Sequence, residues 1–321
     1  MKELTEDKTV VTLPIEWNGE KMGVVNILGY PAEIPEYAKL VRTTIDILLN
    51  YFNLNDQILF RNLEIENWIR ELASTYDFCT QKLEEIARSL SLDVSIPRVA
   101  FMIKIQGEDI LCEHPHCKSL ARFNEIKSTL LAEAAAFPVS DLFISYTGES
   151  RLFLLSSVDQ SRINERQLAE SFMEILSRLG ISALIGIGNV SDGIMGYRQS
   201  FNQAGQSLKL LEKFKIEKTV THIDDWGIID LLDHLPDSVR HEFITRYMPR
   251  FNDLSEEMAG TLKIFLESDM NIKETAEKLH IHRNTLFYRL DKVHEVLKLD
   301  PKSFKDAMII KALDACSQLN A

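Results

Sequence analysis

The sequence predicts an α+β multidomain protein with a hairpin and a long helix first, an α/β domain in the middle and an all-α domain last. A two-residue turn signal separates two strand-like stretches near the N-terminus, and a long helical pattern without Gly or Pro follows. Strand and helix patterns then alternate as far as residue 223, and only helical patterns follow. The 321 residues are 45% hydrophobic and 26% charged, which excludes membrane-spanning, fibrous and disordered classes.

The net charge of -12 is unevenly distributed along the chain. Residues 260–321 hold ten Lys and Arg against nine Asp and Glu, so the rest of the chain carries -13. Because an acidic body repels nucleic acid, any DNA contact is expected on a small face of the C-terminal part. The polar, acidic start is no signal peptide, and four cysteines without disulfide-like spacing indicate the cytoplasm.

Residues 8–29 predict a hairpin that turns at Asn18-Gly19, and a helical pattern then runs from about residue 36 to 74. Eight of ten positions spaced alternately by four and three residues are apolar, which predicts a coiled-coil seam joining two copies. An ordinary buried helix is the alternative. The seam positions are Leu40, Thr44, Ile47, Tyr51, Leu54, Ile58, Arg61, Ile65, Trp68 and Leu72. We therefore divide this part into a hairpin at 1–33 and a dimerisation helix at 34–76.

The stretch 77–225 predicts one α/β domain with the order β-α-β-β-α-β. This order is typical of a ferredoxin-like fold, an antiparallel sheet with helices on one face. A helical connector at 226–258 is expected to follow. The predicted strands are 98–105, a hairpin at 140–157, 181–190 and 219–223, and the predicted helices are 119–135, 161–179 and 194–213.

Residues 259–321 predict a cluster of short helices that contains a helix-turn-helix. Asn271 and Glu274 form a capping-box pair before a helix at 272–279, and a second helix runs from about 282 to 297. In that second helix Leu286, Leu290, Val293 and Leu297 share one face, which is expected to be buried. The first helix of the unit is expected to contribute Leu262, Phe265 and Leu266 to the same core.

The opposite face of the helix at 282–297 carries the residues that a DNA-recognition helix needs. Asn pairs with adenine and Arg with guanine in the major groove, and both residue types lie in its first turn. A solvated helix in a small bundle is the alternative interpretation. The candidate DNA-binding residues are His282, Arg283, Asn284, Thr285, Tyr288, Arg289 and Lys292, with Arg289 nearer the buried edge and able to reach a phosphate.

The stretch NIKETAEKLHIHRNTLFYRLDKVHEVL, residues 271–297, resembles the C-terminal helix-turn-helix of the purine catabolism regulator and carbohydrate diacid regulator families. The block LHIHRNTLFYRL at 279–290 is the most specific part of this resemblance. Both families place this module at the C-terminus, as in this sequence. The resemblance implies a transcription regulator, and more specifically an activator. With the seam predicted at 40–72, we expect it to bind a double-stranded DNA operator as a homodimer or higher homo-oligomer.

Residues 98–223, including SIPRVAFMIKI, resemble the GGDEF-like domain of carbohydrate diacid regulators. That fold is shared with diguanylate cyclases, whose Gly-Gly-Asp/Glu-Glu-Phe signature lies at a hairpin turn. Here the turn is Thr147-Gly148-Glu149-Ser150-Arg151, which keeps only Gly148 and Glu149, and the first strand lacks an acidic metal ligand. The domain is therefore expected to be a degenerate, non-catalytic one.

The N-terminal stretches LPIEWNGEKMGVVNILGYP and EYAKLVRTTIDILL resemble the final hairpin and helix of the sugar diacid recognition domain. That domain normally begins well upstream, so residues 1–33 are expected to be a truncated remnant. The resemblance implies sugar diacids, or the related acid glycerate, as the effector class. We expect this chain by itself to bind such an effector weakly or not at all.

Other motifs predict no further site. Cys112, His114, His116 and Cys117 crowd around Pro115, so a loop is favoured over a metal site. Gly186 and Gly188 lack the third glycine of a dinucleotide fingerprint. No catalytic, metal or cofactor residues are therefore predicted. The predicted function is DNA-binding regulation of carbohydrate diacid or glycerate genes, with a nucleotide-sensing regulator or a cyclic-dinucleotide enzyme as alternatives.

Overall fold

A computed structural model describes residues 9–17, 20–29, 34–74, 79–107, 118–134, 136–139, 141–148, 150–159 and 161–320. The chain divides into two compact units, Met1–Trp68 and Ile69–Ala321, and each has its own architecture. No helix in these described ranges is long and apolar enough to cross a membrane.

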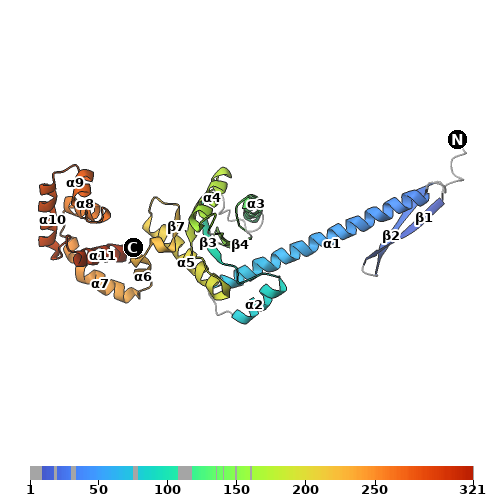
Figure 1. Ribbon diagram of the computed structural model, residues 1–321, viewed down its shortest axis with the longest axis horizontal. Helices are drawn as coiled ribbons and strands as arrows, with labels where there is room; N and C mark the ends of the chain where they lie inside the picture. Colours follow the sequence, from blue (N-terminus) through green and yellow to red (C-terminus); the bar gives the residue numbers. More distant parts are fainter. Residues whose placement is uncertain are drawn as a thin grey trace. The chain divides into compact units, whose positions relative to one another are not determined.

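The first unit holds the predicted hairpin. Strands β1 (Thr9–Trp17) and β2 (Glu20–Gly29) pair antiparallel, with a register shift between Ile15 and Glu16 (Figure 1). The predicted turn at Asn18-Gly19 lies outside the described residues. Because side chains alternate between the faces of a strand, one face of this hairpin is apolar from Val11 to Ile15. Its members are Val11, Leu13, Ile15, Val25 and Ile27.

Helix α1 (Ile34–Leu72) begins and ends two residues before the predicted limits. The seam positions Leu40, Ile47, Tyr51, Leu54 and Ile58 are 50–64% exposed in the single chain. Trp68 and Leu72, in contrast, are 1% and 0% exposed, and Leu72 belongs to the second unit. The prediction of one seam over 40–72 is therefore wrong at its C-terminal end, because side chains already buried in one chain offer no apolar surface to a second copy.

The second unit begins with α2 (Thr80–Ser89) and a five-stranded sheet in the order β4-β5-β3-β6-β7. The central strand β3 is antiparallel to both of its neighbours, and only the short β7 runs parallel to β6. The β-α-β-β-α-β order predicted for this domain is confirmed. The strands are β3 (Arg98–Gln106), β4 (Leu142–Gly148), β5 (Arg151–Ser157), β6 (Ser182–Ile187) and β7 (Val220–His222).

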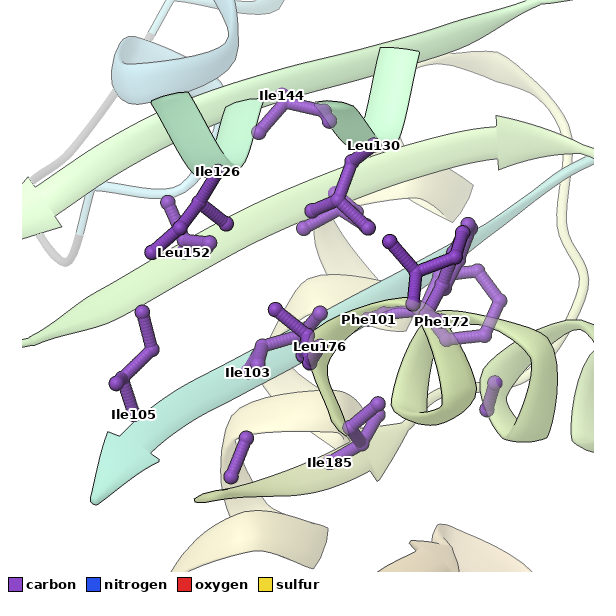
Figure 2. Packing of buried hydrophobic residues seen from close by; sticks show 14 of the residues in the cluster. Phe101, Ile103, Ile105, Ile126, Leu130, Ile144, Leu152, Phe172, Leu176 and Ile185 are labelled. Carbon is purple, nitrogen blue, oxygen red and sulfur yellow. The ribbon is translucent and has the colours of Figure 1, made fainter. Parts of the chain in front are cut away.

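Helices α3 (Lys118–Ala134) and α4 (Glu165–Arg178) pack on one face of this sheet. Figure 2 shows the core between them, where Phe101 of β3 meets Phe172 of α4 edge to face at 5.3 Å between ring centroids. The largest side chains of this core are fully or almost fully buried, as the ferredoxin-like pattern predicted.

Helix α5 (Gly193–Phe214) covers the opposite face of the sheet, so the prediction of helices on one face only is wrong. The Ala100 N–H of β3 donates to Ser200 Oγ of α5 at 2.9 Å, and Phe153 of β5 meets Phe201 edge to face. Alternate residues of β3 thus enter different layers, and nearly all of this strand is buried.

Gly186 and Gly188 explain how α5 approaches β6 so closely. A Cβ atom added at Gly186 would lie 2.2 Å from the Ala204 carbonyl oxygen, and one at Gly188 would lie 2.0 Å from that of Ser200. These glycines therefore serve helix–sheet packing, which agrees with the failed dinucleotide fingerprint.

Helices α6 (Ile228–Asp233), α7 (Asp237–Phe251), α8 (Glu256–Glu267), α9 (Ile272–Lys278), α10 (Arg283–Leu297) and α11 (Phe304–Asn320) complete the unit. α11 is longer than the predicted cluster of short helices implied. Its Leu319 packs with Leu210 and Leu211 of α5 and with Trp226, while its Ile310 joins the core of α8 and α10. α11 therefore ties the C-terminal helices to the α/β domain.

The region of Cys112, His114, His116 and Cys117 lies outside the described residues. Within the described ranges, no group of three or more His, Cys, Asp or Glu side chains is placed to hold a metal ion.

Candidate DNA-binding interface

Helices α8, α9 and α10 form the unit in which the sequence predicts a helix-turn-helix. The Asn271 side chain caps α9 by accepting from the backbone N–H groups of Lys273 at 3.0 Å and Glu274 at 3.2 Å. Glu274 forms an ion pair with Lys278 at 2.7 Å, the i,i+4 arrangement that stabilises a helix. The predicted N-cap is thus confirmed, and the Glu274 carboxylate pairs along the helix with Lys278.

The turn between α9 and α10 is tight because His280 adopts a left-handed conformation with φ of 54°. It is closed by the Ile281 N–H, which donates to the Ala276 carbonyl at 3.0 Å. His282 then caps α10, its Nδ1 accepting from the Asn284 N–H at 3.2 Å. His282 was predicted to lie within the recognition helix as a DNA contact, and the structure makes it the residue that starts this helix.

The buried face of α10 is confirmed residue by residue. Leu286 and Leu290 pack with Phe265 of α8 and Ala276 of α9. Val293 and Leu297 join a neighbouring cluster that also contains Leu262 and Leu266. The four α10 side chains are all 0% exposed, so the helix is fixed in rotation about its own axis.

The first two turns of α10 present the predicted recognition residues to solvent. Arg283, Asn284 and Thr285 are exposed, and Tyr288 is 62% exposed. Since Arg and Asn can each pair bidentately with a base edge, their place in the first turn of a firmly anchored helix suits major-groove recognition.

Arg289 differs from the other candidates. Its guanidinium forms an ion pair with Glu257 of α8 and donates from Nη1 to Thr261 Oγ1 at 3.2 Å. Its side chain is 19% exposed. The side chain that was predicted to reach outward to a phosphate therefore lies against α8, where it holds α10 to its neighbour.

Lys292 lies on the exposed flank of α10, but its ammonium has partners inside the helix. It pairs with Glu295 at 2.6 Å and lies 5.9 Å from the Tyr288 ring centroid. The hydrogen bond that Lys292 donates to the Glu295 carboxylate raises the pKa of Lys292. A phosphate would thus compete with a local carboxylate for this cation.

Sequence reasoning missed Lys273 as a candidate. An open groove between α9 and α10 brings this exposed lysine of α9 together with Arg283 of α10. The available signal was its place in the first turn after the Asn271 cap, because the start of the first helix of such a unit meets the DNA backbone. The groove is lined by Ile272, Lys273, Ala276, Glu277, His280, Ile281 and Arg283.

The degenerate turn of the α/β domain carries a different electrostatic pattern. Lys104, near the end of β3, forms an ion pair with Glu212 of α5, and Arg151 Nη2 lies 3.9 Å from the same carboxylate. Ser150 adopts a left-handed conformation, and its carbonyl accepts from the Ile105 N–H at 2.9 Å. Glu149 lies outside the described residues. The basic side chains of Lys104 and Arg151 therefore lie beside this turn, whereas a magnesium ion there would need carboxylate ligands.

Comparison with known families assigns all three parts of the chain. Residues 258–312 match the PucR C-terminal helix-turn-helix domain, and this range covers α9, α10 and all but the first two residues of α8. Residues 79–210 match the GGDEF-like domain, and residues 1–72 match the putative sugar diacid recognition domain. The chain is therefore similar to the carbohydrate diacid regulators in all three of its parts. It is a DNA-binding transcription regulator, as the resemblance predicted.

The similarity to individual members of this family extends over most of the chain. The carbohydrate diacid regulator of Escherichia coli is 21% identical over 94% of this chain and 77% of its own length. YsfB of Bacillus subtilis is 26% identical over 91% of this chain and 74% of its own. The purine catabolism regulatory protein of Bacillus subtilis is 27% identical over 55% of this chain and 34% of its own.

Proposed function

We propose that this chain is a member of the carbohydrate diacid regulator family, an activator that binds a two-part operator as a homodimer in the cytoplasm. The observation that carries the proposal is the first turn of α10, where exposed Arg283 and Asn284 stand on a helix whose other face is fully buried. The regulated genes are those for the use of carbohydrate diacids or the related acid glycerate, a choice supported by the named relative from Escherichia coli.

Dimerisation is proposed through α1. Its seam from Leu40 to Ile58 exposes large apolar side chains in a single chain, and burying them would remove apolar surface from water. A second copy of the same helix suits such a seam because its apolar positions recur with heptad spacing.

Dimerisation matters for DNA binding because one C-terminal unit is almost neutral. With ten basic and nine acidic residues in 260–321, one unit gains little from phosphate attraction. Two linked units bind more tightly, since the second contact forms at a high effective concentration.

The domains are proposed to act in sequence. The effector-recognition part at 1–33 biases the pair of long helices at 34–76, and the middle domain at 77–225 and connector at 226–258 pass this bias to the DNA-binding domain at 259–321. A ligand can shift this equilibrium only by its differential affinity for the two arrangements. A thermal-shift screen with glucarate, galactarate, glycerate and nucleotides tests the effector class. A ligand at 100 times its Kd would add about 2.7 kcal/mol of stability.

The GGDEF-like domain is proposed to work without catalysis. Ser150 and Arg151 stand where the family resemblance places the catalytic Glu and Phe, and Lys104 stands near the end of the strand that would carry an acidic metal ligand. Incubation with GTP and magnesium should yield no cyclic diguanylate, and added cyclic diguanylate should persist. Product formation that disappears in Glu149→Gln would favour the enzyme alternative. Nucleotide binding without product would favour the nucleotide-sensing alternative.

The DNA-binding proposal is tested by selecting sites from random duplex DNA with the full chain. We expect enrichment of a motif with two related halves. An Asn284→Ala, Arg283→Ala double variant that melts at the parental temperature should lose that motif. Failure of the folded parent to enrich any sequence would contradict the proposal.

A further inference from the structure

An apolar groove separate from the DNA-binding face lies between α6 and α11. It encloses about 590 Å³, and most of its wall is apolar. We call it the α6–α11 groove. Its lining residues are Ile228, Leu232, Leu266, Asp269, Met270, Phe304, Ala307, Met308, Lys311 and Ala312.

Large apolar side chains project beside this groove. Phe304 is 73% exposed and Met308 is 55% exposed, one turn apart on α11. On α6, Ile228 is 55% and Leu231 is 60% exposed. A projecting aromatic ring next to an apolar hollow is a surface that can insert into a copy of itself, and exposed patches of this kind mark interaction sites.

The charges in the groove lining also favour a second copy of this chain over a partner of one charge sign. Asp269 and Lys311 are both exposed, and neither forms an ion pair within the described ranges. One acid and one base in the same patch are self-complementary, because a two-fold axis can bring each acid toward the base of the other copy.

We propose that the α6–α11 groove is a second, isologous contact between two copies of the DNA-binding domain. Phe304 of each copy enters the groove of the other, and Asp269 of each faces Lys311 of its mate. The relative orientation of the two domains rests on the proposed two-part operator. If its two halves are related by an approximate two-fold axis, two bound domains face each other with the same surface.

This contact leaves the recognition residues free. None of the groove-lining residues comes from α10, and Arg283, Asn284 and Tyr288 lie outside the lining. The groove includes Asp269 and Met270 of the turn before α9. Pairing there would therefore fix the relative orientation of two recognition helices, whereas α1 would hold the two chains together.

Cysteine cross-linking of the full chain tests the contact. In a background with Cys79, Cys112 and Cys117 changed to Ser, Met308→Cys should give cross-linked dimers with a short bismaleimide, and operator DNA should increase the yield. Lys305→Cys is the matched control, since it is exposed on the same helix but does not line the groove. Equal yields from the two variants would overturn the proposal.

Charge reversal in that cross-linking background provides the second arm. Asp269→Lys and Lys311→Asp should each reduce the Met308→Cys cross-link several-fold, because each places like charges in contact twice. Co-expression of the two differently tagged variants should restore the yield in mixed dimers, where both contacts are again attractive. A role confined to one chain would not be restored by mixing, and that result would also overturn the proposal.

Folding and DNA binding are measured on the same variants. Thermal melting should show parental stability for the reversed variants, and Lys is compatible with the left-handed backbone at 269, since Lys215 and Lys298 occupy that region in this chain. Site selection that succeeds without the cross-link contradicts the groove contact alone. A specific cross-link without any selected motif contradicts the proposed function alone.

Discussion

Arg289 of α10 and Glu257 of α8 form an ion pair across the helix-turn-helix unit, and Arg289 also donates to Thr261 Oγ1 at 3.2 Å. Thr261 is itself 1% exposed and donates to the Glu257 carbonyl at 2.8 Å. The Arg289 guanidinium therefore lies against the buried edge of α8 and links the recognition helix to it, so the guanidinium does not extend into solvent.

Arg289→Ala is expected to lower the free energy of unfolding by about 1 kcal/mol, the usual contribution of such a hydrogen-bonded contact. Denaturant melts of the full chain measure this, with Glu257→Gln as a variant that removes the same pair from α8. The salt dependence of DNA affinity should stay at the parental slope. If Arg289→Ala kept the parental stability but lowered the salt slope of DNA affinity by about one unit, Arg289 would be a phosphate contact after all.

Replacing Arg283 or Asn284 by Ala should relax the preferred base at one position of each half-site. The expected cost is about 1–3 kcal/mol at that base pair, because each side chain can make a bidentate contact. Lys292→Ala should weaken binding to all DNA sequences alike. It should lower the salt slope of DNA affinity by at most about one unit, since Glu295 already pairs with this ammonium. Site selection at two salt concentrations measures both effects, with Lys305→Ala as the control. An unchanged motif in Asn284→Ala together with an altered motif in Lys292→Ala would contradict this assignment of faces.

Leu286→Ala should destabilise the helix-turn-helix by roughly 2–5 kcal/mol through loss of buried methyl groups and the cavity left behind. Leu286 is 0% exposed, whereas the adjacent Phe287 is 40% exposed and serves as the control. Phe287→Ala should therefore cost far less. Thermal melts monitored by circular dichroism compare the two variants. Equal losses would mean that α10 is rotated about its axis relative to the structure.

Charged residues in the α1 seam should weaken self-association. Ile47→Asp with Ile58→Asp would place unpaired carboxylates in a dry interface, whereas Arg61→Leu would lengthen the apolar seam and should strengthen association. Asn53→Asp, on the opposite side of the helix, is the matched control. Light scattering over a concentration series measures the molar mass. A double variant that remains a dimer like its control would move the dimer interface away from α1.

Acid stability should depend on the ion pair between Asp225 and Arg166 of α4, whose atoms lie 2.8 Å apart. The hydrogen bond from Arg166 lowers the pKa of Asp225. A carboxyl whose pKa is lower in the folded state stabilises the fold above its unfolded pKa of about 3.9, and this contribution disappears as the pH falls through the folded value. Arg166→Ala should therefore raise the pH midpoint of acid unfolding.

Arg162→Ala is the control for this pH dependence. Asp159, its partner at 3.3 Å, has its pKa lowered chiefly by the Ser161 hydroxyl, so losing Arg162 should leave the acid midpoint almost unchanged. Equal shifts in the two variants would show that net charge, and not the Asp225 pair, sets the acid limit.

Patterns that repeat within one element were enough to predict much of this protein. Heptad spacing located α1 within two residues at each end, and strand alternation gave the order of the α/β domain. The spacing of Leu286, Leu290, Val293 and Leu297 gave the buried face of α10 and therefore its exposed face. These features depend on the spacing of residues within one element, and this spacing can be read without knowing which other elements pack against it.

Contacts between distant elements were decided only by the tertiary structure. Because β3 is packed on both faces, its sequence alone does not show that α5 closes the second face. The sequence predicted that Arg289 contacts DNA, because helical geometry places it at the edge of the buried face of α10. In the structure its guanidinium instead pairs with Glu257, 32 residues earlier in the chain. The α6–α11 groove likewise depends on two helices about 80 residues apart in the sequence meeting in space. Sequence periodicity determined which face of each element is apolar, and packing decided what each face meets.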